Sequence, residues 1–259
     1  MNKILTYLIG ILLVAIALAH AEDHELAKLF TERKINGTLI ISSLDSKTEF
    51  IYNKERAGKR FLPASTFKIP NTLIALEENA IANETEVIKW DGTDKGWRPW
   101  NKDQTLETAF PLSCVWFYQE LAKRVGNAKY LSHLRKLNYG NKKTGPEVTT
   151  FWLEGDLKIS AREQIEFLKN FYKEDLPYKK SFIHCLKKLM VVDKNPRYTL
   201  SAKTGWAMRI RNQLGWYVGY VETDQNTWFF ATNLDIIKKS DAAFREEITM
   251  KALKIKGII

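Results

Sequence analysis

The chain has 259 residues, of which 45% are hydrophobic, and a formal net charge of +10 at pH 7. A chain of this length and composition can bury one sizeable core without relying on disulfides or metals. The basic residues come in dispersed pairs such as Lys142-Lys143 and Lys187-Lys188, which is typical of solvated surfaces, and no nucleic-acid motif accompanies them. We therefore expect one globular unit of catalytic size with no nucleic-acid partner.

Residues 1–21 differ in kind from the rest of the chain. Lys3 precedes an apolar run over residues 4–19, and Ala19-His20-Ala21 has the small-x-small pattern of a cleavage site. The run is short for a membrane span, which disfavours the alternative of an uncleaved anchor. The sequence thus predicts a signal peptide over residues 1–21 with cleavage near Ala21. It also predicts a periplasmic or secreted protein with no membrane association after cleavage.

Strands are predicted near both ends of the remaining chain. A short helix over residues 25–34 precedes a β-hairpin of two extended runs, 38–44 and 48–52. Near the C-terminus, residues 198–206, 214–222 and 227–234 are rich in β-branched and aromatic residues and predict three antiparallel strands. A last helix is expected to be capped by Asp241 and to run to Lys254.

The middle of the chain, residues 65–188, has helical periodicity instead. One helix carries apolar residues from Val115 to Val125 and ends at Gly126. Another begins at the capping box formed by Ser160 and Glu163. This order predicts a mixed α/β fold, with an antiparallel β-sheet flanked by helices and built from both ends of the chain. An inserted, mostly helical lobe completes it, and the site is expected between the two parts.

The cysteines and histidines point to no metal centre. Cys114 and Cys185 could form a disulfide in an exported chain or remain buried free thiols, and we favour the free thiols. No two of the 4 histidines share a metal-ligand spacing. We therefore expect neither a metal site nor a serine-histidine triad.

The stretch FLPASTFKIP places Ser65 three residues before Lys68. A serine hydroxyl becomes a good nucleophile when a base removes its proton, and a lysine one helical turn away can be that base if it is neutral or modified. Apolar neighbours such as Phe67 and Ile69 would desolvate the ammonium and lower its pKa. Taken alone, the motif also fits a helix cap followed by a surface lysine.

Three further short motifs follow in order along the chain. They are Ser113-Cys-Val115, Tyr139-Gly-Asn141 and Lys203-Thr-Gly205, with the stretch FWLEG at 151–155 between the last two. Together with Ser65-Thr-Phe-Lys68 they resemble the signature set of the class D β-lactamases, the oxacillinases. The resemblance implies one catalytic domain over residues 22–259, with a fold like that of serine β-lactamases and penicillin-binding proteins.

The resemblance also implies a chemistry. The chain would hydrolyse β-lactams through an acyl-enzyme on Ser65 and so confer β-lactam resistance. Lys68 would be carboxylated by carbon dioxide and act as the general base for acylation and deacylation, with no other cofactor. Trp152 would donate its indole N–H to the carbamate, and Val115 would keep polar groups away from it. For Trp152 alone, core packing is the default alternative.

Four residues besides Ser65 and Lys68 are assigned to the reaction centre by the same resemblance. Ser113 would relay a proton to the leaving nitrogen, and Lys203 would supply positive potential across the cleft. The backbone N–H groups of Trp206 and Ser65 would form the oxyanion hole. Gly205 would let the substrate approach the strand closely.

The remaining positions would bind the substrate or form the wall of the site. Arg245, assisted by Thr204, would bind the substrate carboxylate, although a surface arginine on the last helix is the alternative. Tyr139 and Asn141 are taken as a site wall, although a turn after a helix uses the same residues. The side-chain pocket would include Trp100, Leu153 and Met208, for each of which packing is the alternative. Arg209 lies in a loop similar to that of class D enzymes that act on carbapenems.

Several other functions compete with a β-lactamase. A β-lactam sensor domain shares the first, third and fourth motifs but is acylated without turnover, and it tends to have a polar residue where Val115 stands. A wall transpeptidase or carboxypeptidase, or a class A β-lactamase, would carry a different triplet at Ser113. A non-catalytic wall-binding protein would leave Ser65, Lys68 and Lys203 unexplained. We expect small-molecule β-lactam substrates and a monomer or homodimer.

Overall fold

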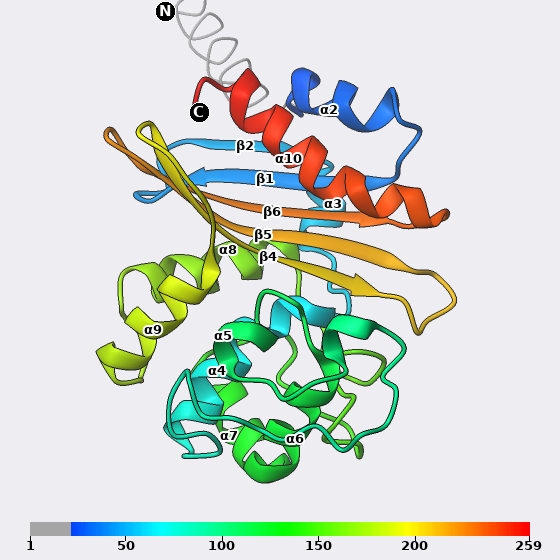
Figure 1. The fold of residues 1–259 in the computed structure, drawn as a ribbon. Helices are drawn as coiled ribbons and strands as arrows, with labels where there is room; N and C mark the ends of the chain where they lie inside the picture. Colours follow the sequence, from blue (N-terminus) through cyan, green and yellow to red (C-terminus); the bar gives the residue numbers. More distant parts are fainter. Residues whose placement is uncertain (1–21) are drawn as a thin grey trace, which may run out of the picture.

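The computed structural model describes residues 22–259, so the signal peptide expected at residues 1–21 lies outside the described residues. The architecture is a six-stranded sheet with helices on both faces (Figure 1). No helix within residues 22–259 is both long and apolar enough to cross a membrane.

The sheet is antiparallel throughout and joins the two ends of the chain. Its strand order is β2-β1-β6-β5-β4-β3. The strands are β1 (Gly37–Ser43), β2 (Glu49–Tyr52), β3 (Val191–Lys194), β4 (Tyr198–Ala207), β5 (Leu214–Thr223) and β6 (Thr227–Asp235). The N-terminal strand β1 pairs with the C-terminal strand β6, with Leu39 opposite Thr232. The predicted hairpin, the three C-terminal strands and the sheet built from both termini are thereby confirmed.

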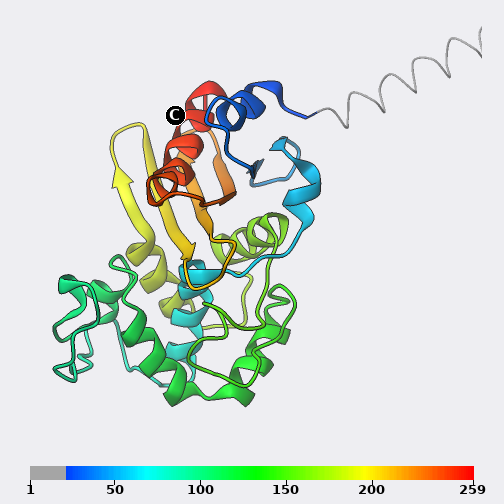
Figure 2. The ribbon, with the colours of Figure 1, turned by 90° about the vertical axis from the view of Figure 1, so that its right-hand side faces the viewer.

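Helices pack on the two faces of this sheet in unequal numbers. One face is covered by α2 (His24–Thr31) and α10 (Phe244–Ile255). The opposite side carries α8 (Ala161–Tyr172), α9 (Lys180–Met190) and the helical lobe (Figure 2). The lobe and the segment that enters it comprise α3 (Lys54–Gly58), α4 (Lys68–Glu77), α5 (Leu106–Ala109), α6 (Val115–Val125) and α7 (Asn127–Lys136). Short 3-10 turns are η1 (Ala64–Phe67), η2 (Arg98–Trp100) and η3 (Lys239–Ala243).

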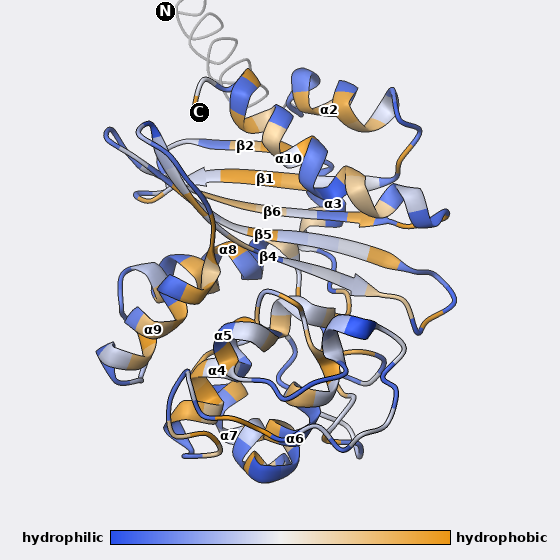
Figure 3. Ribbon diagram, in the orientation of Figure 1, coloured by the Kyte–Doolittle hydropathy of each residue, from blue (hydrophilic) through white to orange (hydrophobic). Residues whose placement is uncertain are grey.

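Two hydrophobic clusters correspond to the two faces of the sheet. The larger fills the lobe and its contact with the sheet, and the smaller lies between the sheet and the pair α2 and α10. In Figure 3 apolar residues run along β1 and α4, which are almost entirely buried. Helix α4 therefore forms the centre of the lobe, and the side chains at its first turn lie in a desolvated environment.

Local signals account for most element boundaries. The capping box is present, because Ser160 Oγ accepts from the Glu163 backbone N–H at 3.2 Å and Glu163 Oε2 accepts from Ser160 N–H at 2.9 Å. Helix α6 ends at Gly126, whose φ of 81° is tolerated by glycine. Cys114 is buried, Cys185 is half-buried, and both thiols are free.

The structure differs from the sequence prediction at the start of the last helix and in one additional strand. Asp241 does not cap the last helix: it lies inside η3, its carboxylate accepts from the backbone N–H groups of Ile237 and Lys238, and α10 begins at Phe244. Strand β3 was not predicted. It is a four-residue edge strand with every residue exposed, so it lacks the alternation of buried and exposed residues that marks a half-buried strand.

Candidate active site

The candidate nucleophile Ser65 lies on the 3-10 turn η1, three residues before α4 begins at Lys68. The turn is entered through Ala64, whose φ of 49° is left-handed, and the Ala64 N–H donates to the Trp152 carbonyl at 2.9 Å. A left-handed conformation costs a non-glycine residue about 1 kcal/mol, and such strain collects at functional sites. The surrounding contacts therefore hold Ser65 in a conformation that this short stretch would not prefer by itself.

Lys68 is the first residue of α4, and its side chain is fully buried. Its Nζ atom lies 3.1 Å from Ser65 Oγ and 5.0 Å from the centroid of the Tyr118 ring. Burial lowers the pKa of this ammonium from 10.5 to about 7. A large fraction of Lys68 is therefore neutral at physiological pH and can accept a proton or react with an electrophile.

Ser113 and Lys203 form a second serine–lysine pair. Ser113, with a left-handed φ of 52°, precedes α6, and its Oγ is hydrogen-bonded to Nζ of Lys203 from β4. Lys203 is buried, and its Nζ lies 5.7 Å from the Phe110 ring centroid. Burial, followed by the charges of Lys68 and Arg245, lowers the pKa of Lys203 well below its usual value. The two pairs are thus coupled electrostatically across the site.

Trp152 and Val115 border this region. The Trp152 ring is fully buried and stacks on Phe67 with centroids 5.8 Å apart, and its Nε1–H has no hydrogen-bond partner among residues 22–259. A buried indole N–H normally finds an acceptor, so its solitary position indicates that a group bound here would supply one. Val115 is the half-buried first residue of α6, which makes that end of the helix apolar.

Gly205 of β4 faces the nucleophile turn. A Cβ atom at this position would lie 3.0 Å from the Pro63 carbonyl oxygen and 3.1 Å from Thr66 Cγ2. The sequence interpretation assigned Gly205 to close approach of a substrate, but the chain itself occupies this space. The missing side chain lets β4, the strand of Lys203, pack directly against η1, the turn of Ser65.

Arg245 reaches the same strand from the first turn of α10. Its Nη1 donates to the Gly205 carbonyl at 3.3 Å, and its Nε lies 3.8 Å from Glu246 Oε1. Nε makes no hydrogen bond within the described part of the chain. Burial lowers the pKa of the guanidinium, which means that its charge is incompletely compensated. Beside the half-buried Thr204, it is suited to bind an anion.

The predicted substrate pocket is only partly assembled by direct contacts. Trp100 Nε1 donates to the Leu112 carbonyl at 3.0 Å, which ties this indole to the residue before Ser113. Leu153 is buried, whereas Met208 is 55% exposed beyond the end of β4. The nearby loops are joined by an ion pair, Arg209 Nη1 to Glu154 Oε1, at 3.2 Å.

Trp206, Tyr139 and Asn141 make contacts with the scaffold. The Trp206 indole donates to Gln213 Oε1 at 2.9 Å, so it is the backbone of Trp206, not its ring, that remains for a substrate. Tyr139 is buried against Phe67, with ring centroids 5.8 Å apart. Asn141 accepts from the Lys158 N–H at 3.0 Å and donates to the Asp156 carbonyl at 2.7 Å. Tyr139 therefore packs behind the turn that carries the nucleophile, Asn141 holds the segment 156–158, and a role of either residue as a site wall stays a prediction.

Two buried polar residues at the site were missed by sequence reasoning. Gln164 of α8 is fully buried, and its Nε2–H donates to Thr66 Oγ1 at 2.9 Å. Thr66 stands beside the nucleophile within the S-x-x-K motif. Gln164 directly follows the capping box, on a face of α8 that the sequence pattern assigns to packing against the rest of the protein. The signal that could have identified it is a polar residue at a position where helical periodicity requires an apolar one.

Fold and site together define a class. An antiparallel sheet lies beside a helical lobe, with one serine–lysine pair at the start of the lobe's central helix and a second pair between Ser113 of the lobe and Lys203 of the sheet. This arrangement indicates a protein of the penicillin-binding type. The model for the family described as penicillin binding protein transpeptidase domain matches residues 18–254.

Similar proteins narrow this class. The chain is 41% identical over 230 residues to β-lactamase OXA-48 of Klebsiella pneumoniae, covering 89% of this chain and 87% of that protein. It is 36% identical to β-lactamase OXA-10 of Pseudomonas aeruginosa over 264 residues, covering 100% and 99% of the two chains. The crystal structure of FUS-1 (OXA-85), a class D β-lactamase from Fusobacterium nucleatum subsp. polymorphum, superposes with a TM-score of 0.90 at 38% identity, covering 92% and 100%. The chain belongs to the class D β-lactamases.

Proposed function

We propose that this protein hydrolyses the amide bond of β-lactam antibiotics through an acyl-enzyme on Ser65 and thereby confers resistance to them. The observation that carries the proposal is the position of the fully buried Lys68 Nζ, 3.1 Å from Ser65 Oγ, with a pKa of about 7. An amine in this state can assist removal of the hydroxyl proton at neutral pH.

We further propose that carbon dioxide carboxylates Lys68. The residues present fit such a group: the amine is unprotonated to a large extent, the Trp152 N–H has no acceptor within residues 22–259, and Val115 contributes an apolar border. When present, the carbamate would supply the general base for both half-reactions. Replacing the positive charge at Lys68 by a negative one would also raise the pKa of Lys203, because the Lys68 charge is one cause of its depression.

Each bond change has a residue to support it. Ser65 Oγ attacks the lactam carbonyl carbon, its proton passes to the base at Lys68, and the C–N bond of the ring breaks. The Ser113 hydroxyl, hydrogen-bonded to Lys203, delivers a proton to the departing nitrogen. The proton that the base took from Ser65 replaces the one that Ser113 gave up, so the base is free again. A water molecule then attacks the ester carbonyl and gives a proton to the base, the bond between Ser65 Oγ and the acyl carbon breaks, and the base returns that proton to Ser65 Oγ. The products are the ring-opened acid and free Ser65.

The substrate would be held by the strand and the last helix. The N–H groups of Ser65 and Trp206 would bind the developing oxyanion. Arg245 and Thr204 would bind the carboxylate of the β-lactam, because the half-buried guanidinium lies beside β4 with its Nη1 at the Gly205 carbonyl, next to Thr204. Trp100 and Leu153 are proposed to contact the variable side chain of the substrate.

Export completes the proposal. Signal cleavage near Ala21 would place the mature protein in the periplasm or outside the cell, where β-lactams reach their wall targets. Intact-mass measurement of the protein secreted by an expressing bacterium would test this. A mass that corresponds to residues 22–259 is expected, and a full-length mass in the membrane fraction would contradict it.

The catalytic proposal is tested by following the protein's intact mass after mixing with a penicillin. We expect an adduct of the mass of the drug that forms and then decays as product accumulates, and no adduct in the Ser65→Ala variant. A stable adduct without turnover would identify a β-lactam sensor or a penicillin-binding protein instead. Peptide mapping should locate the adduct on the peptide that contains Ser65.

A further inference from the structure

The segment that leads into the nucleophile is fastened to residues 152–164 at four successive points. Arg60 pairs with Glu163, and Phe61 forms a two-way backbone bridge with Ile159, each hydrogen bond being 2.8 Å long. Further in, the Ala64 N–H donates to the Trp152 carbonyl, and Gln164 donates to Thr66. The contacts progress from the surface to the interior and end at the two residues that flank Ser65.

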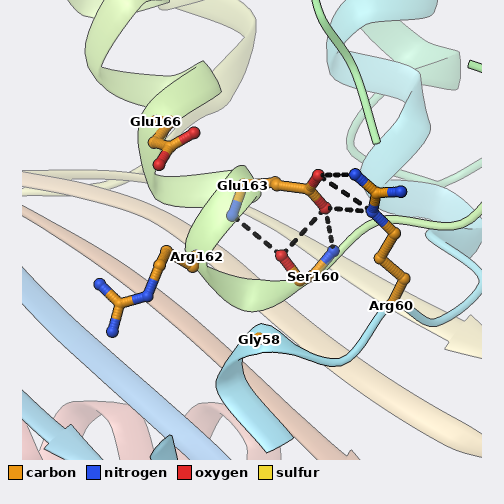
Figure 4. A pocket seen from close by; sticks show the side chains of 6 residues that line it. All are labelled: Gly58, Arg60, Ser160, Arg162, Glu163 and Glu166. Atoms are coloured by element: carbon orange, nitrogen blue, oxygen red, sulfur yellow. Dashed lines mark hydrogen bonds and ion pairs between the residues drawn. The ribbon is translucent and has the colours of Figure 1, made fainter. Parts of the chain in front are cut away.

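The outer end of this series of four contacts, the ion pair of Arg60 and Glu163, is partly exposed to solvent. Figure 4 shows the cavity of about 520 Å³ beside it, where Glu163 bonds the guanidinium of Arg60 and also the backbone N–H and hydroxyl of Ser160. Arg60 and Glu163 are fully paired with each other and are partly solvated. This end fixes the start of α8 relative to the chain entering η1, and its solvent exposure limits its energetic contribution.

The inner end of the series, the hydrogen bond from Gln164 to Thr66, is buried, and its donor and acceptor are defined. Gln164 and Thr66 are both fully buried. Gln164 Nε2–H donates to Thr66 Oγ1 at 2.9 Å, and the Thr66 hydroxyl donates in turn to the Pro63 carbonyl at 2.8 Å. Because Gln164 is a donor here, the threonine proton must point at Pro63, which fixes the direction of the whole chain of bonds.

The Pro63 carbonyl is where the constraints meet. It accepts from the Thr66 hydroxyl and from the Thr66 N–H at 3.2 Å, and it lies against Gly205 of β4. The bonds therefore close a loop over Ala64 and Ser65. Within that loop, the left-handed Ala64 determines the directions of the Ser65 N–H and Oγ. Loosening the loop would let Ala64 relax and turn both groups away from the bound substrate.

Tyr139 adds a third polar group to this buried cluster. Burial raises the pKa of its phenol, and the side chains of Thr66 and Gln164 beside it reduce that rise. The aromatic ring packs on Phe67, the residue before Lys68. Tyr139 therefore belongs to the support of η1, together with Gln164 and Thr66.

We infer that Gln164 is a positioning residue for the acyl-transfer reaction, acting through the Thr66 hydroxyl on the orientation of Ser65. This inference rests on the proposed function, since acylation of Ser65 is what it controls. A well-oriented nucleophile and oxyanion donor affect the acylation rate more than substrate affinity. Gln164 should therefore influence the rate of acylation at saturating substrate. It should have little effect on the substrate concentration at which the acylation rate is half-maximal.

The test compares single-turnover acylation in the parent with Gln164→Met, Thr66→Val and the double variant. We expect each single variant to acylate at least about tenfold more slowly at saturating β-lactam, and the double variant to be no slower than the slower single one. Thr66→Ser retains the hydroxyl and should stay within about twofold of the parent. Thr38→Val is the matched control, because Thr38 is a fully buried threonine of β1 whose hydroxyl donates to backbone carbonyls at 2.6 and 3.0 Å.

The outcomes separate positioning from simple stabilisation. Thr38→Val should lower the melting temperature as Thr66→Val does while leaving acylation unchanged. Acylation within twofold of the parent in Gln164→Met and Thr66→Val would overturn the inference, as would rate losses that multiply in the double variant. If Gln164→Met does not fold, Thr66→Val against Thr66→Ser decides alone. A parent protein that is never acylated would instead reject the proposed function.

Discussion

Three lysines among residues 22–259 lie against serine hydroxyls: Lys68, Lys203 and Lys169. Lys203 belongs to the same site as Lys68, so the informative comparison is between Lys68, the proposed base, and Lys169, which lies elsewhere. Lys68 Nζ is 3.1 Å from Ser65 Oγ, whereas Lys169 Nζ, on α8, is 2.9 Å from Ser42 Oγ and 2.7 Å from Ser46 Oγ. Burial lowers the pKa of both ammonium groups. Proximity of serine and lysine, and desolvation as such, therefore do not distinguish a catalytic pair from a structural one.

The surroundings make the difference. Lys169 is near the carboxylates of Glu49, Asp45 and Glu166, which favour its charged form, and it joins α8 to the hairpin of β1 and β2. Lys68 is fully buried, and the indole N–H of Trp152 lacks an acceptor in the part of the chain that the structure describes. Lys169, with carboxylates near it, stays charged and links two elements of the fold. Lys68, buried without a nearby carboxylate among the causes of its pKa shift, is suited to act as a base.

The largest expected contrast is between removal of the two amines. Lys68→Ala should reduce kcat/KM for a penicillin by about a hundred- to ten-thousand-fold, the usual contribution of a general base. Lys169→Ala should lower the melting temperature but leave kcat/KM within about threefold of the parent. Steady-state hydrolysis and thermal melts of both variants measure this. Comparable activity losses in the two variants would contradict the assignment of Lys68 to catalysis and of Lys169 to structure.

The unpaired indole provides the next largest effect. Trp152→Phe keeps the aromatic packing and removes the N–H, which should cost about 1.5–3 kcal/mol if that group binds a carbamate, or roughly ten- to a hundredfold in deacylation. Added bicarbonate should restore part of the rate. Trp90→Phe is the control, because this indole bonds only the Thr93 carbonyl on the exposed loop. A Trp152→Phe variant with parental turnover and no bicarbonate response would assign Trp152 to packing alone.

A polar side chain at the apolar border should separate the two half-reactions. Val115→Asn brings an amide towards the base at Lys68, so we expect acylation close to the parental rate and deacylation slowed by about tenfold. Rapid mixing with a chromogenic substrate would then show a burst followed by slow turnover. If Val115→Asn turns over penicillin as fast as the parent, the role given to Val115 is wrong.

Arg245 tests the carboxylate-binding role proposed for the side of the site formed by β4 and α10. Arg245→Ala should raise the KM for β-lactams by about tenfold and change kcat less, because the guanidinium binds a carboxylate present in the ground state and the transition state alike. Arg245→Lys should recover part of the affinity. The idea would be contradicted by an unchanged KM accompanied by a reduced kcat.

A separate effect, on folding and not on catalysis, is expected in the pH dependence of stability. With a pKa of about 7 in the folded protein against 10.5 for the ordinary side chain, Lys68 binds fewer protons folded than unfolded between those values. The parent should therefore gain unfolding free energy relative to Lys68→Met as pH rises from about 7 to about 10.5, with a slope approaching about 1.4 kcal/mol per pH unit. Below pH 7 Lys68 is charged in both states, so the full cost of burying its charge remains. The difference in unfolding free energy between the parent and Lys68→Met then becomes constant. Urea unfolding in bicarbonate-free buffer would measure it, and a flat difference would show that the buried amine is not desolvated.

Much of the fold follows from local signals, whereas the site required relations between distant residues. The hairpin, the C-terminal strands and the cap at Ser160 are coded by turn residues, β-branched runs and capping chemistry close in sequence. The exposed β3 carries no such signal, and Asp241 could cap either of two adjacent turns. The hydrogen bond between Ser113 and Lys203 follows from the packing of the lobe on the sheet. The family resemblance assigned both residues to the site but did not pair them with each other. Gln164 was missed because its partner, Thr66, is distant in sequence.

The central claim is that Ser65 is acylated and then released with the help of a modified Lys68. Its most direct test is a progress curve of excess chromogenic cephalosporin with the protein comprising residues 22–259, with and without added bicarbonate. The account predicts continuous hydrolysis over many equivalents, faster or more sustained with bicarbonate. A burst of about one equivalent followed by no further hydrolysis, with or without bicarbonate, would contradict it.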